Sequence, residues 1–504
     1  MPDIILATLN ARYAHSAFGL RYLMANLGEL QSRARLLESD LGHNSLDIAE
    51  SILIRKPVIV GLGVYIWNAQ QSLRLVADLK RIAPQLLIVL GGPEISHETE
   101  QQELAALADY VITGEGDLAF GDLCRQLLSG QRPPQKIIAP SPPDLGAIQL
   151  PYDLYDENDI AHRVIYVEAS RGCPFECDFC LSALDARVRA VPLERFLPAM
   201  QKLLDRGARH FKFVDRTFNL NISTSLAILR FFLDRCRPGL FLHCEIIPDR
   251  LPAELCQLIR QFPAGALQFE VGIQTFNESV AARISRRQDN AKAEDNLRFL
   301  RSQSSVHIHA DLIAGLPGED IDSFAAGFDR LVALGPQEIQ LGILKRLRGA
   351  PIARHDRQWR MVYSPQPPYE VLSTSEIDFP TMQRIRRFAS YWDMICNSGH
   401  FLATAPLIWA GGSPFRSFMT LSDWLFAREG RTHAIALPRL ARLIFDYLTT
   451  QAKRDPKQVA EALSSDGRAV GRRHAPEFPG AAEGAGPPSS GSRGLRRQSR
   501  HHAQ

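Results

Sequence analysis

Short runs of Ile, Leu and Val alternate with amphipathic stretches over the first 130 residues of the 504-residue chain. The apolar runs, which are typical of strands, cover 3–9, 34–39, 57–65, 86–92 and 109–116. Between them lie stretches such as 72–84, in which apolar residues recur at helical spacing. Short apolar strands alternating with helices predict a parallel, doubly wound sheet. Ligands of such sheets bind outside the carboxyl ends of the strands.

The same alternation returns over residues 161–345. The strand candidates, in chain order, are 163–170, 210–215, 240–247, 266–274, 305–315 and 337–344. Helical patterns such as 192–207 fall between them. Six β/α units are fewer than the eight of a closed barrel, so the pattern predicts a partial (β/α)6 barrel with an open side.

Composition marks the boundaries between these regions. Residues 136–160 are rich in Pro and polar residues, which indicates a linker. Residues 346–466 have mainly helical patterns, whereas 467–504 are of low complexity, which indicates a disordered basic tail. We therefore expect an α/β domain over 1–135, a linker over 136–160, a partial barrel over 161–345, a helical domain over 346–466 and a tail over 467–504.

Charge and hydropathy exclude several kinds of partner. The tail carries seven Arg and two Glu, so it accounts for more than the whole net charge of +3 and gives little support for a nucleic-acid partner. The basic run 344–360 could receive a phosphorylated or nucleic-acid substrate, although a solvated surface explains most such runs.

No stretch has the ~18–20 apolar residues of a membrane span, and the first ten residues lack the basic region of a secretion signal. We expect a cytoplasmic protein with no membrane partner and with reduced thiols.

Three of the eight cysteines stand close together in the stretch RGCPFECDFC, directly after the first strand of the expected barrel. They are Cys173, Cys177 and Cys180. Thiolates are the soft ligands that select zinc or iron–sulfur clusters. Structural zinc takes four ligands, and no further Cys or His lies within ten residues on either side. Because three thiolates on a four-iron cluster leave one iron open for a small molecule, the spacing favours such a cluster.

A Cys-x3-Cys-x2-Cys loop in this position resembles the radical S-adenosylmethionine (SAM) superfamily. The resemblance implies that Cys173, Cys177 and Cys180 are catalytic residues that ligate a [4Fe–4S] cluster. It implies that SAM binds the open iron and is cleaved reductively to a 5′-deoxyadenosyl radical, which takes a hydrogen atom from the substrate. It also implies an electron donor such as a flavodoxin or a ferredoxin.

The expected SAM contacts lie beside the motif and at strand ends. By the resemblance, Phe179 lies against the cluster or the adenine. Polar residues at the ends of the strands converge on the mouth of a barrel, although each could instead cap the helix that follows it. The remaining expected SAM contacts are Asp215, Glu270, Gln274, Asp311 and Gly315.

Most of the chain is similar to the branch of this superfamily that has a cobalamin-binding domain. The first sheet followed by the barrel carries this likeness, and 88–97 and 109–120 resemble the strand-end loops of the branch. One uncharacterised subgroup, which has a C-terminal domain of unknown function, is resembled by 211–221, 270–275, 311–319 and 338–371. The likeness implies a Rossmann-like cobalamin-binding fold for the first domain and cobalamin as a third cofactor.

The sequence departs from the cobalamin-binding pattern at one point. That pattern contains Asp-x-His-x-x-Gly, whose histidine binds cobalt, and none of His15, His43 and His97 stands in it. Either cobalamin binds without a protein histidine on cobalt, or the domain has lost the cofactor; we favour binding. The expected contacts, each of which could instead serve packing between domains, are Tyr13, His15, Ser16, Tyr65, Trp67, Asn68, Gly92, Glu94, Gly114 and Glu115.

The resemblance therefore predicts a cobalamin-dependent radical SAM enzyme, a transferase that methylates an unactivated carbon of an unknown small molecule. Two alternatives stay open: a cobalamin-independent radical SAM rearrangement enzyme, and a non-catalytic sensor that binds cobalamin or a cluster. A methylthiotransferase is rejected because it needs three more cysteines in the first domain, which has only Cys124.

Overall fold

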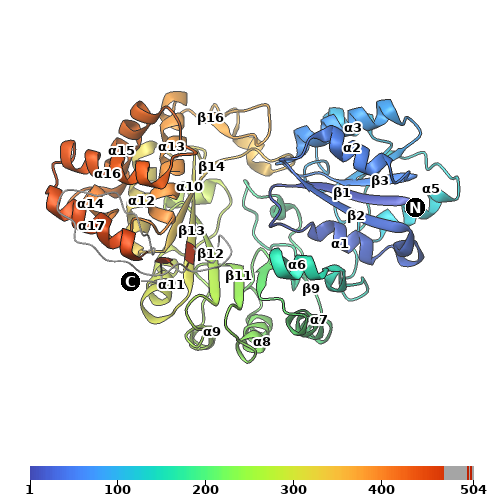
Figure 1. Ribbon diagram of the computed structural model, residues 1–504, viewed down its shortest axis with the longest axis horizontal. Coiled ribbons are helices and arrows are strands. Elements are labelled where there is room, and N and C mark those ends of the chain that lie inside the picture. Colours follow the sequence, from blue (N-terminus) through green and yellow to red (C-terminus); the bar gives the residue numbers. More distant parts are fainter. Residues whose placement is uncertain (470–496, 499, 502–504) are drawn as a thin grey trace. The chain divides into compact units, whose positions relative to one another are not determined.

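The computed structural model describes residues 1–469, 497, 498, 500 and 501 (Figure 1). The chain forms two compact units. The first comprises residues 1–216, 346–351 and 364–369, and the second comprises 217–345, 352–363 and the described part of 370–504. Among the helices of the described residues, none is long and apolar enough to cross a membrane.

The first unit begins with a six-stranded parallel sheet in the order β2-β1-β3-β4-β5-β6. Its strands are β1 (Ile4–Asn10), β2 (Ala34–Asp40), β3 (Ile59–Gly63), β4 (Leu87–Gly91), β5 (Tyr110–Ile112) and β6 (Ile137–Ile138). Its helices are α1 (Phe18–Ala25), η1 (Gly28–Arg33), α2 (Ser45–Leu53), α3 (Ala69–Ile82), η2 (Thr99–Gln101), α4 (Glu103–Leu107) and α5 (Ala119–Leu128). This arrangement confirms the expected doubly wound sheet.

Apolar side chains cover both faces of this sheet, which explains why its strands are apolar at nearly every position. On one face, Ile52 of α2 and Leu75 of α3 pack against Val60 of β3. On the other face, Leu20 of α1 and Phe120 of α5 complete a second core. Figure 1 shows α2 and α3 on one side of the strands and α1 on the other.

The rest of the first unit leads into the cysteine loop. Its elements are η3 (Tyr152–Leu154), α6 (Glu157–His162), β7 (Ile165–Val167), β8 (Ser170–Arg171), η4 (Leu181–Leu184), β9 (Arg189–Ala190), α7 (Leu193–Asp205) and β10 (His210–Phe213). Strands β8 and β9 pair antiparallel at the base of the loop. The expected linker 136–160 contributes β6 to the first sheet, and it also contains η3 and the beginning of α6.

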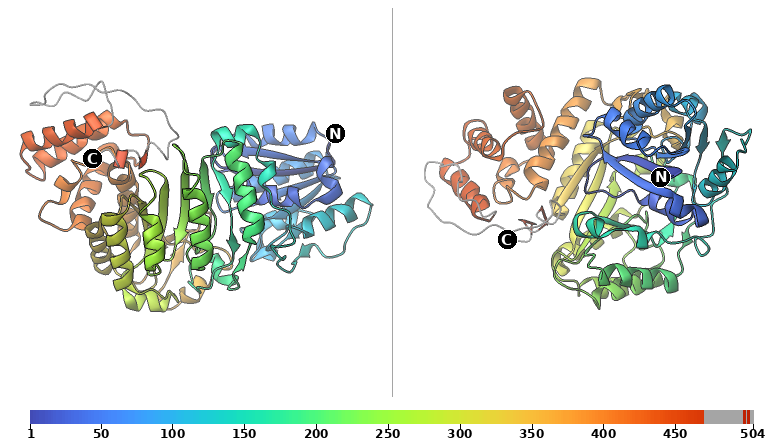
Figure 2. Two further views of the ribbon diagram at one scale, coloured as in Figure 1. Left: turned by 90° about the horizontal axis from the view of Figure 1, so that it is seen from below. Right: turned by 45° about the vertical axis from the view of Figure 1, so that its right-hand side comes forward.

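The second sheet has six strands in the order β14-β13-β12-β11-β10-β7. The second unit supplies α8 (Ile222–Leu233), β11 (Phe241–Ile246), α9 (Ala253–Ile259), β12 (Leu267–Gln274), α10 (Glu278–Arg283), α11 (Asn290–Gln303), β13 (His307–Ala314), α12 (Ile321–Leu334) and β14 (Glu338–Ile343). Its strands pair in parallel. The connecting helices, green to olive in Figure 2, lie along one side of these strands. The expected partial (β/α)6 barrel is confirmed.

The chain ends in a mainly helical region, as expected. Its elements are η5 (Pro351–His355), β15 (Val362–Tyr363), β16 (Val371–Ser373), α13 (Phe379–Trp392), the π-helix η6 (Asp393–Asn397), α14 (Pro406–Trp409), α15 (Pro414–Glu429), α16 (Leu437–Thr450) and α17 (Pro456–Ala469). Phe388 and Trp392 of α13 form an aromatic core with Phe418 of α15. Most of the expected tail, 467–504, lies outside the described residues.

Candidate functional site

The three cysteines of the motif lie on the loop between β8 and β9. Cys173 and Cys177 are buried, Cys180 is partly buried, and none of them forms a disulfide. The backbone N–H of Cys180 donates to the Cys177 carbonyl at 3.0 Å, and that of Cys173 donates to the Asp185 carbonyl at 2.9 Å. Burial raises the pKa of Cys173, and the neighbouring thiols add to this rise, so a bound cation would stabilise its thiolate.

The loop requires glycine directly before the first cysteine. Gly172 has a φ of +94°, and a Cβ there would lie 2.4 Å from the Arg187 carbonyl oxygen. No three His, Cys, Asp or Glu side chains among residues 1–469, 497, 498, 500 and 501 are grouped around a single metal ion. A four-iron cluster takes each thiolate on a different iron, so its ligands stand farther apart than those of one ion.

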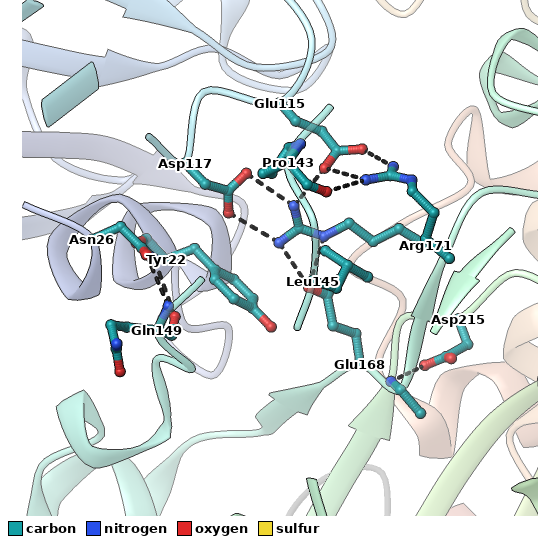
Figure 3. Close-up of polar contacts among 12 residues, drawn as sticks. Tyr22, Asn26, Glu115, Asp117, Pro143, Leu145, Gln149, Glu168, Arg171 and Asp215 are labelled. Carbon is teal, nitrogen blue, oxygen red and sulfur yellow. Dashed lines mark hydrogen bonds and ion pairs between the residues drawn. The ribbon is translucent and has the colours of Figure 1, made fainter. Parts of the chain in front are cut away.

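An arginine two residues before Cys173 binds three carboxylates (Figure 3). Arg171 Nη1 lies 2.7 Å from Glu115 Oε2 and 2.9 Å from Asp117 Oδ2. Its Nη2 donates to Asp117 Oδ1 at 3.0 Å, and its Nε donates to Glu168 Oε1 at 2.8 Å. The guanidinium also lies over the Tyr22 ring, 4.6 Å from its centroid. These contacts join the cysteine loop to the loop that follows β5.

A second arginine, Arg189, also binds Glu115. Arg189, which pairs with Arg171 across β8 and β9, donates to both Glu115 oxygens, to Asp185 Oδ2 at 3.0 Å and to the Pro143 carbonyl at 3.0 Å. Burial favours the protonated form of Glu115, but bonds from Arg189 and Arg171 outweigh it and lower the pKa of this carboxyl. Glu115 is therefore held as a carboxylate.

Asp215 lies immediately after β10 and binds the residues that precede Arg171. Its Oδ2 accepts from the Ala169 N–H at 3.0 Å, and its Oδ1 accepts from Ser170 Oγ at 2.6 Å. Burial raises the pKa of Asp215 to about 7 in spite of these bonds. Its expected contact with SAM stays a prediction, since both oxygens already hold the strand end.

A cavity of about 220 Å³ lies at the carboxyl edge of the first sheet. Four of the expected cobalamin contacts line it: Tyr65, Gly92, Gly114 and Glu115. Its wall is otherwise rich in glycine, and at two of these positions a larger side chain would collide with the protein. A Cβ on Gly61 would lie 2.7 Å from the Phe120 ring, and one on Gly92 would lie 2.5 Å from the Val64 carbonyl oxygen. The cavity also reaches Glu168 and Arg171 beside the cysteine loop.

The other expected cobalamin contacts do not line this cavity. Trp67 stacks on Tyr65 with ring centroids 4.5 Å apart, and its Nε1 donates to the Leu9 carbonyl at 3.2 Å. Asn68 is buried, and its Nδ2 donates to the carbonyls of Leu9 and Gly63 at 3.1 Å. Asn68 therefore ties the end of β3 to the end of β1.

Three more of these residues contact the segment 158–166, which includes the start of β7. Tyr13 accepts a hydrogen bond from Asn158. His15 Nδ1 lies 2.6 Å from the Tyr166 hydroxyl, and burial lowers the pKa of this histidine. Ser16 donates to the Val164 carbonyl at 3.0 Å. The structure thus gives them packing contacts within the first unit, and their role in binding cobalamin stays a prediction.

Glu94 contacts the short segments 346–351 and 364–369. It accepts from the Tyr369 hydroxyl, and its Oε1 lies 3.0 Å from Arg348 Nε. Part of the basic run 344–360 is therefore neutralised by acidic residues, which weakens its interpretation as a phosphate-binding surface.

In the second unit, the expected SAM contacts lie on β12, on β13 and directly after β13. Glu270 lies 2.9 Å from His243 Nε2, and Asp311 lies 3.4 Å from His309 Nε2. Gln274 has a φ of +68° at a bulge of β12. Gly315 has a φ of +87°, and a Cβ there would lie 2.6 Å from Val371. Phe179, in the first unit, is half-buried beside the cysteines.

The sequence interpretation missed Asp117, Glu168 and Arg171. The sequence contained a signal for two of these residues. Arg171 stands in the cysteine motif itself, and Asp117 stands two residues after the expected contact Glu115 in the stretch GEGD. What the sequence did not provide was the pairing between two segments more than 50 residues apart.

Comparison with known proteins gives three family matches. Residues 4–124 match the B12 binding domain, 167–331 match the radical SAM superfamily, and 357–476 match a protein family of unknown function, DUF4080. The chain carries a B12-binding domain and a radical SAM domain. The expected class of protein and the expected subgroup are thereby confirmed. A radical SAM domain implies a [4Fe–4S] cluster and SAM, and a B12-binding domain implies cobalamin, so the expected cofactors are confirmed as well.

Two curated relatives of this chain are methyltransferases. The cobalamin-dependent radical SAM methyltransferase TokK of Streptomyces tokunonensis is 24% identical over 59% of this chain and 48% of its own length. An uncharacterized methyltransferase of Pyrococcus horikoshii is 30% identical over 36% of this chain and 44% of its own length. This chain thus spans about half the length of the curated relatives it matches.

Solved structures share the fold. The cobalamin-dependent SAM radical enzyme OxsB, with aqua-cobalamin bound, has a TM-score of 0.60 at 12% identity over 93% of this chain and 79% of its own. The radical SAM methyltransferase TsrM of Kitasatospora setae, with cobalamin and a [4Fe–4S] cluster bound, has a TM-score of 0.58 at 16% identity over 72% and 76%.

The residues present fit the implied groups. Three thiols on one loop provide the ligand set of a cluster with an open iron. The cavity wall leaves the backbone open to a ligand at Gly114, where a Cβ would meet nothing within 4 Å. Tyr65 lies on this wall, and Trp67 stacks on the Tyr65 ring. The Tyr65 ring provides aromatic surface for a large planar ligand.

Proposed function

We propose that this chain is a cobalamin-dependent radical SAM methyltransferase that methylates an unactivated carbon of a small molecule. The observation that carries the proposal is that one compact unit contains both the three-cysteine loop and the glycine-lined cavity at the edge of the first sheet. An enzyme that combines the two cofactors needs both sites in one framework.

When bound, the cofactors would supply reductive cleavage of SAM and transfer of a methyl group. In this proposal Cys173, Cys177 and Cys180 ligate the cluster, and the burial of the first two limits access of water. Asp215 holds the strand end from which the loop begins. The ring of Tyr65 and the glycine-rich wall of the cavity would hold cobalamin.

The relatives support methyl transfer, since TokK and TsrM are both named as radical SAM methyltransferases. The substrate of this chain stays unidentified. We further propose that the protein works in the cytoplasm and receives its electron from a flavodoxin or a ferredoxin, since radical SAM enzymes generally need an electron donor.

Methylthio transfer is the second activity found among the relatives. The ribosomal protein uS12 methylthiotransferase RimO of Porphyromonas gingivalis is 25% identical over 31% of this chain and 37% of its own length. Such an enzyme needs three more cysteines before the radical SAM domain. Residues 1–135 have only Cys124, which lies on α5 and is fully buried in the core. We therefore favour methylation.

The test is SAM cleavage by the full chain after anaerobic reconstitution with iron and sulfide. We expect the wild-type protein, reduced with dithionite, to form 5′-deoxyadenosine, and the Cys173→Ala protein to form none. Cys256→Ala serves as the control, because Cys256 is a partly buried thiol like Cys180 but lies on α9, outside the motif. It should retain the wild-type rate.

The outcomes separate the alternatives. No 5′-deoxyadenosine from the wild-type protein with an intact cluster would contradict the proposal and favour a sensor. Cleavage of SAM by a protein that binds no cobalamin would favour the cobalamin-independent rearrangement enzyme.

A further inference from the structure

Arg171 lies at the boundary of two cavities of the first unit. One is the glycine-lined cavity of about 220 Å³, and the other, of about 200 Å³, lies beside the cysteine loop and is lined by Gly172, Ser182 and Asp185. The two cavities share three lining residues: Glu115, Glu168 and Arg171. The Arg171 side chain therefore forms part of the wall of both.

The base of the cysteine loop is held to the first sheet through Glu115. Arg171 and Arg189 face each other across β8 and β9, and both donate to this one carboxylate. Because Gly172 and Cys173 directly follow Arg171, the position of its guanidinium constrains the first cysteine of the motif. Asp185 adds a second constraint, since its carbonyl accepts from the Cys173 N–H and its carboxylate accepts from Arg189.

The binding mode of Arg171 is specific to arginine. Its planar guanidinium binds Asp117 through two parallel hydrogen bonds and contacts Glu115 and Glu168 with the remaining N–H groups. The side chain is only 15% exposed, so its charge is poorly compensated by water. A lysine has the same charge, but it has no planar fork and cannot serve three carboxylates in this geometry.

We propose that Arg171 is a positioning residue that couples cobalamin binding to the cluster-bound form of the cysteine loop. A molecule that fills the first cavity contacts the loop Glu115–Asp117, and this loop fixes Arg171 and thus Cys173. A cluster that orders the cysteine loop fixes the same contacts from the other side. Coupling of this kind is reciprocal, so each cofactor raises the affinity for the other by the same factor.

The inference rests on the cofactors of the proposed function, but its test does not use turnover. The affinity of the full chain for hydroxocobalamin is measured anaerobically by equilibrium dialysis, with bound cobalt as the readout, in the cluster-free and the cluster-loaded protein. For wild type we expect the dissociation constant to fall about five-fold or more when the cluster is present. For Arg171→Lys we expect the ratio to fall to about two or less.

The matched control is Arg21→Lys. Arg21 is also a buried arginine of the first unit, with a side chain 3% exposed, and it binds Glu38 at 2.7 Å and Asp159 at 2.6 Å. It lines neither cavity. A purely structural role of buried arginines predicts the same loss of coupling in both variants, whereas the proposal predicts a wild-type ratio for Arg21→Lys.

Asp117→Asn tests the same contact from the other side and replaces Arg171→Lys if that variant does not fold. It should also reduce the ratio toward one. A ratio near one in wild type, a wild-type ratio in the folded Arg171→Lys or Asp117→Asn protein, or an equal loss in Arg21→Lys would each overturn the coupling. A wild-type protein that binds no hydroxocobalamin would overturn both the coupling and the cofactor assignment. If the cluster still raises the affinity for hydroxocobalamin as expected but SAM is not cleaved, only the proposed function is overturned.

Discussion

Two regions of the molecule contain carboxylates near strand ends, and the pKa values of these carboxylates shift in opposite directions: that of Glu115 is lowered and that of Glu319 is raised. Around Arg171, two arginines hold Glu115 ionised and keep its pKa below the ordinary value. In the loop after β13, Glu319 is 2% exposed and accepts a 2.6 Å hydrogen bond from Thr275 Oγ1. Burial dominates there and raises the pKa of Glu319 to about 7.

The opposite pKa shifts correspond to different structural roles of the two regions. The Arg171 region joins two segments distant in sequence, and charge-assisted bonds make that joint strong and directional. The Glu319 region lies between neighbouring strands of the second unit, where a neutral carboxyl can complete the packing. Burial and arginine contacts together set these pKa values: two arginines outweigh burial at Glu115, whose side chain is 22% exposed, whereas burial raises the pKa of Glu168 in spite of its bond with Arg171.

The largest effect is expected for Arg171→Met. Removal of the cation leaves Asp117 and Glu168 buried without a balancing charge, while Glu115 keeps only Arg189, so the apoprotein should lose about 3–5 kcal/mol of unfolding free energy. Urea unfolding measures this loss. The matched control Arg125→Met removes an exposed arginine paired with Asp122 and should cost less than about 1 kcal/mol. Equal losses of unfolding free energy in the two variants would contradict the stronger contribution that we assign to the buried Arg171 contacts.

The next effect concerns pH and Glu319. Its pKa is raised from the ordinary 4.5 to about 7, so the folded state binds more protons between these values and stability falls as pH rises. Between pH 5 and pH 8 this group should remove about 2 kcal/mol. Glu319→Gln, which keeps the shape without the charge, should lack this slope. A wild-type slope in the variant would show that other groups cause it.

Glu115→Gln should give a smaller effect with the opposite sign. Because the pKa of Glu115 is lowered, its contribution to stability is present above its ordinary 4.5 and is lost as pH falls. The variant should cost about 1–2 kcal/mol at pH 7, and the deficit should shrink below pH 4.5. Urea unfolding of both proteins at several pH values measures this; a deficit that grows toward low pH would contradict the assignment.

The smallest effect is expected at an exposed pair of the same domain. Arg33 is 51% exposed and lies 2.5 Å from Asp3. Arg33→Ala should cost less than about 1 kcal/mol in urea unfolding, because water already solvates both groups. A loss comparable with that of Arg171→Met would mean that burial does not set the strength of these pairs.

Most of the architecture could be predicted from the sequence, because the apolar strands and amphipathic helices of both sheets follow simple periods. The cysteines could be predicted because three soft ligands stand within eight residues. The partners of Arg171 could not be predicted, since Glu115 and Asp117 stand more than 50 residues before it and only the folded chain brings them together. His15, Asn68 and Glu94 were expected to contact cobalamin from their places at strand ends, yet the structure gives each of them partners within the protein.

The most direct test of the central claim is the cofactor content of a single preparation. After anaerobic reconstitution with iron, sulfide and hydroxocobalamin, we expect about four irons and one cobalamin per chain, retained through gel filtration. The Cys173→Ala protein should lose the iron and still bind cobalamin, although less tightly. A wild-type chain that retains about one iron, or that retains no cobalamin, would contradict the account.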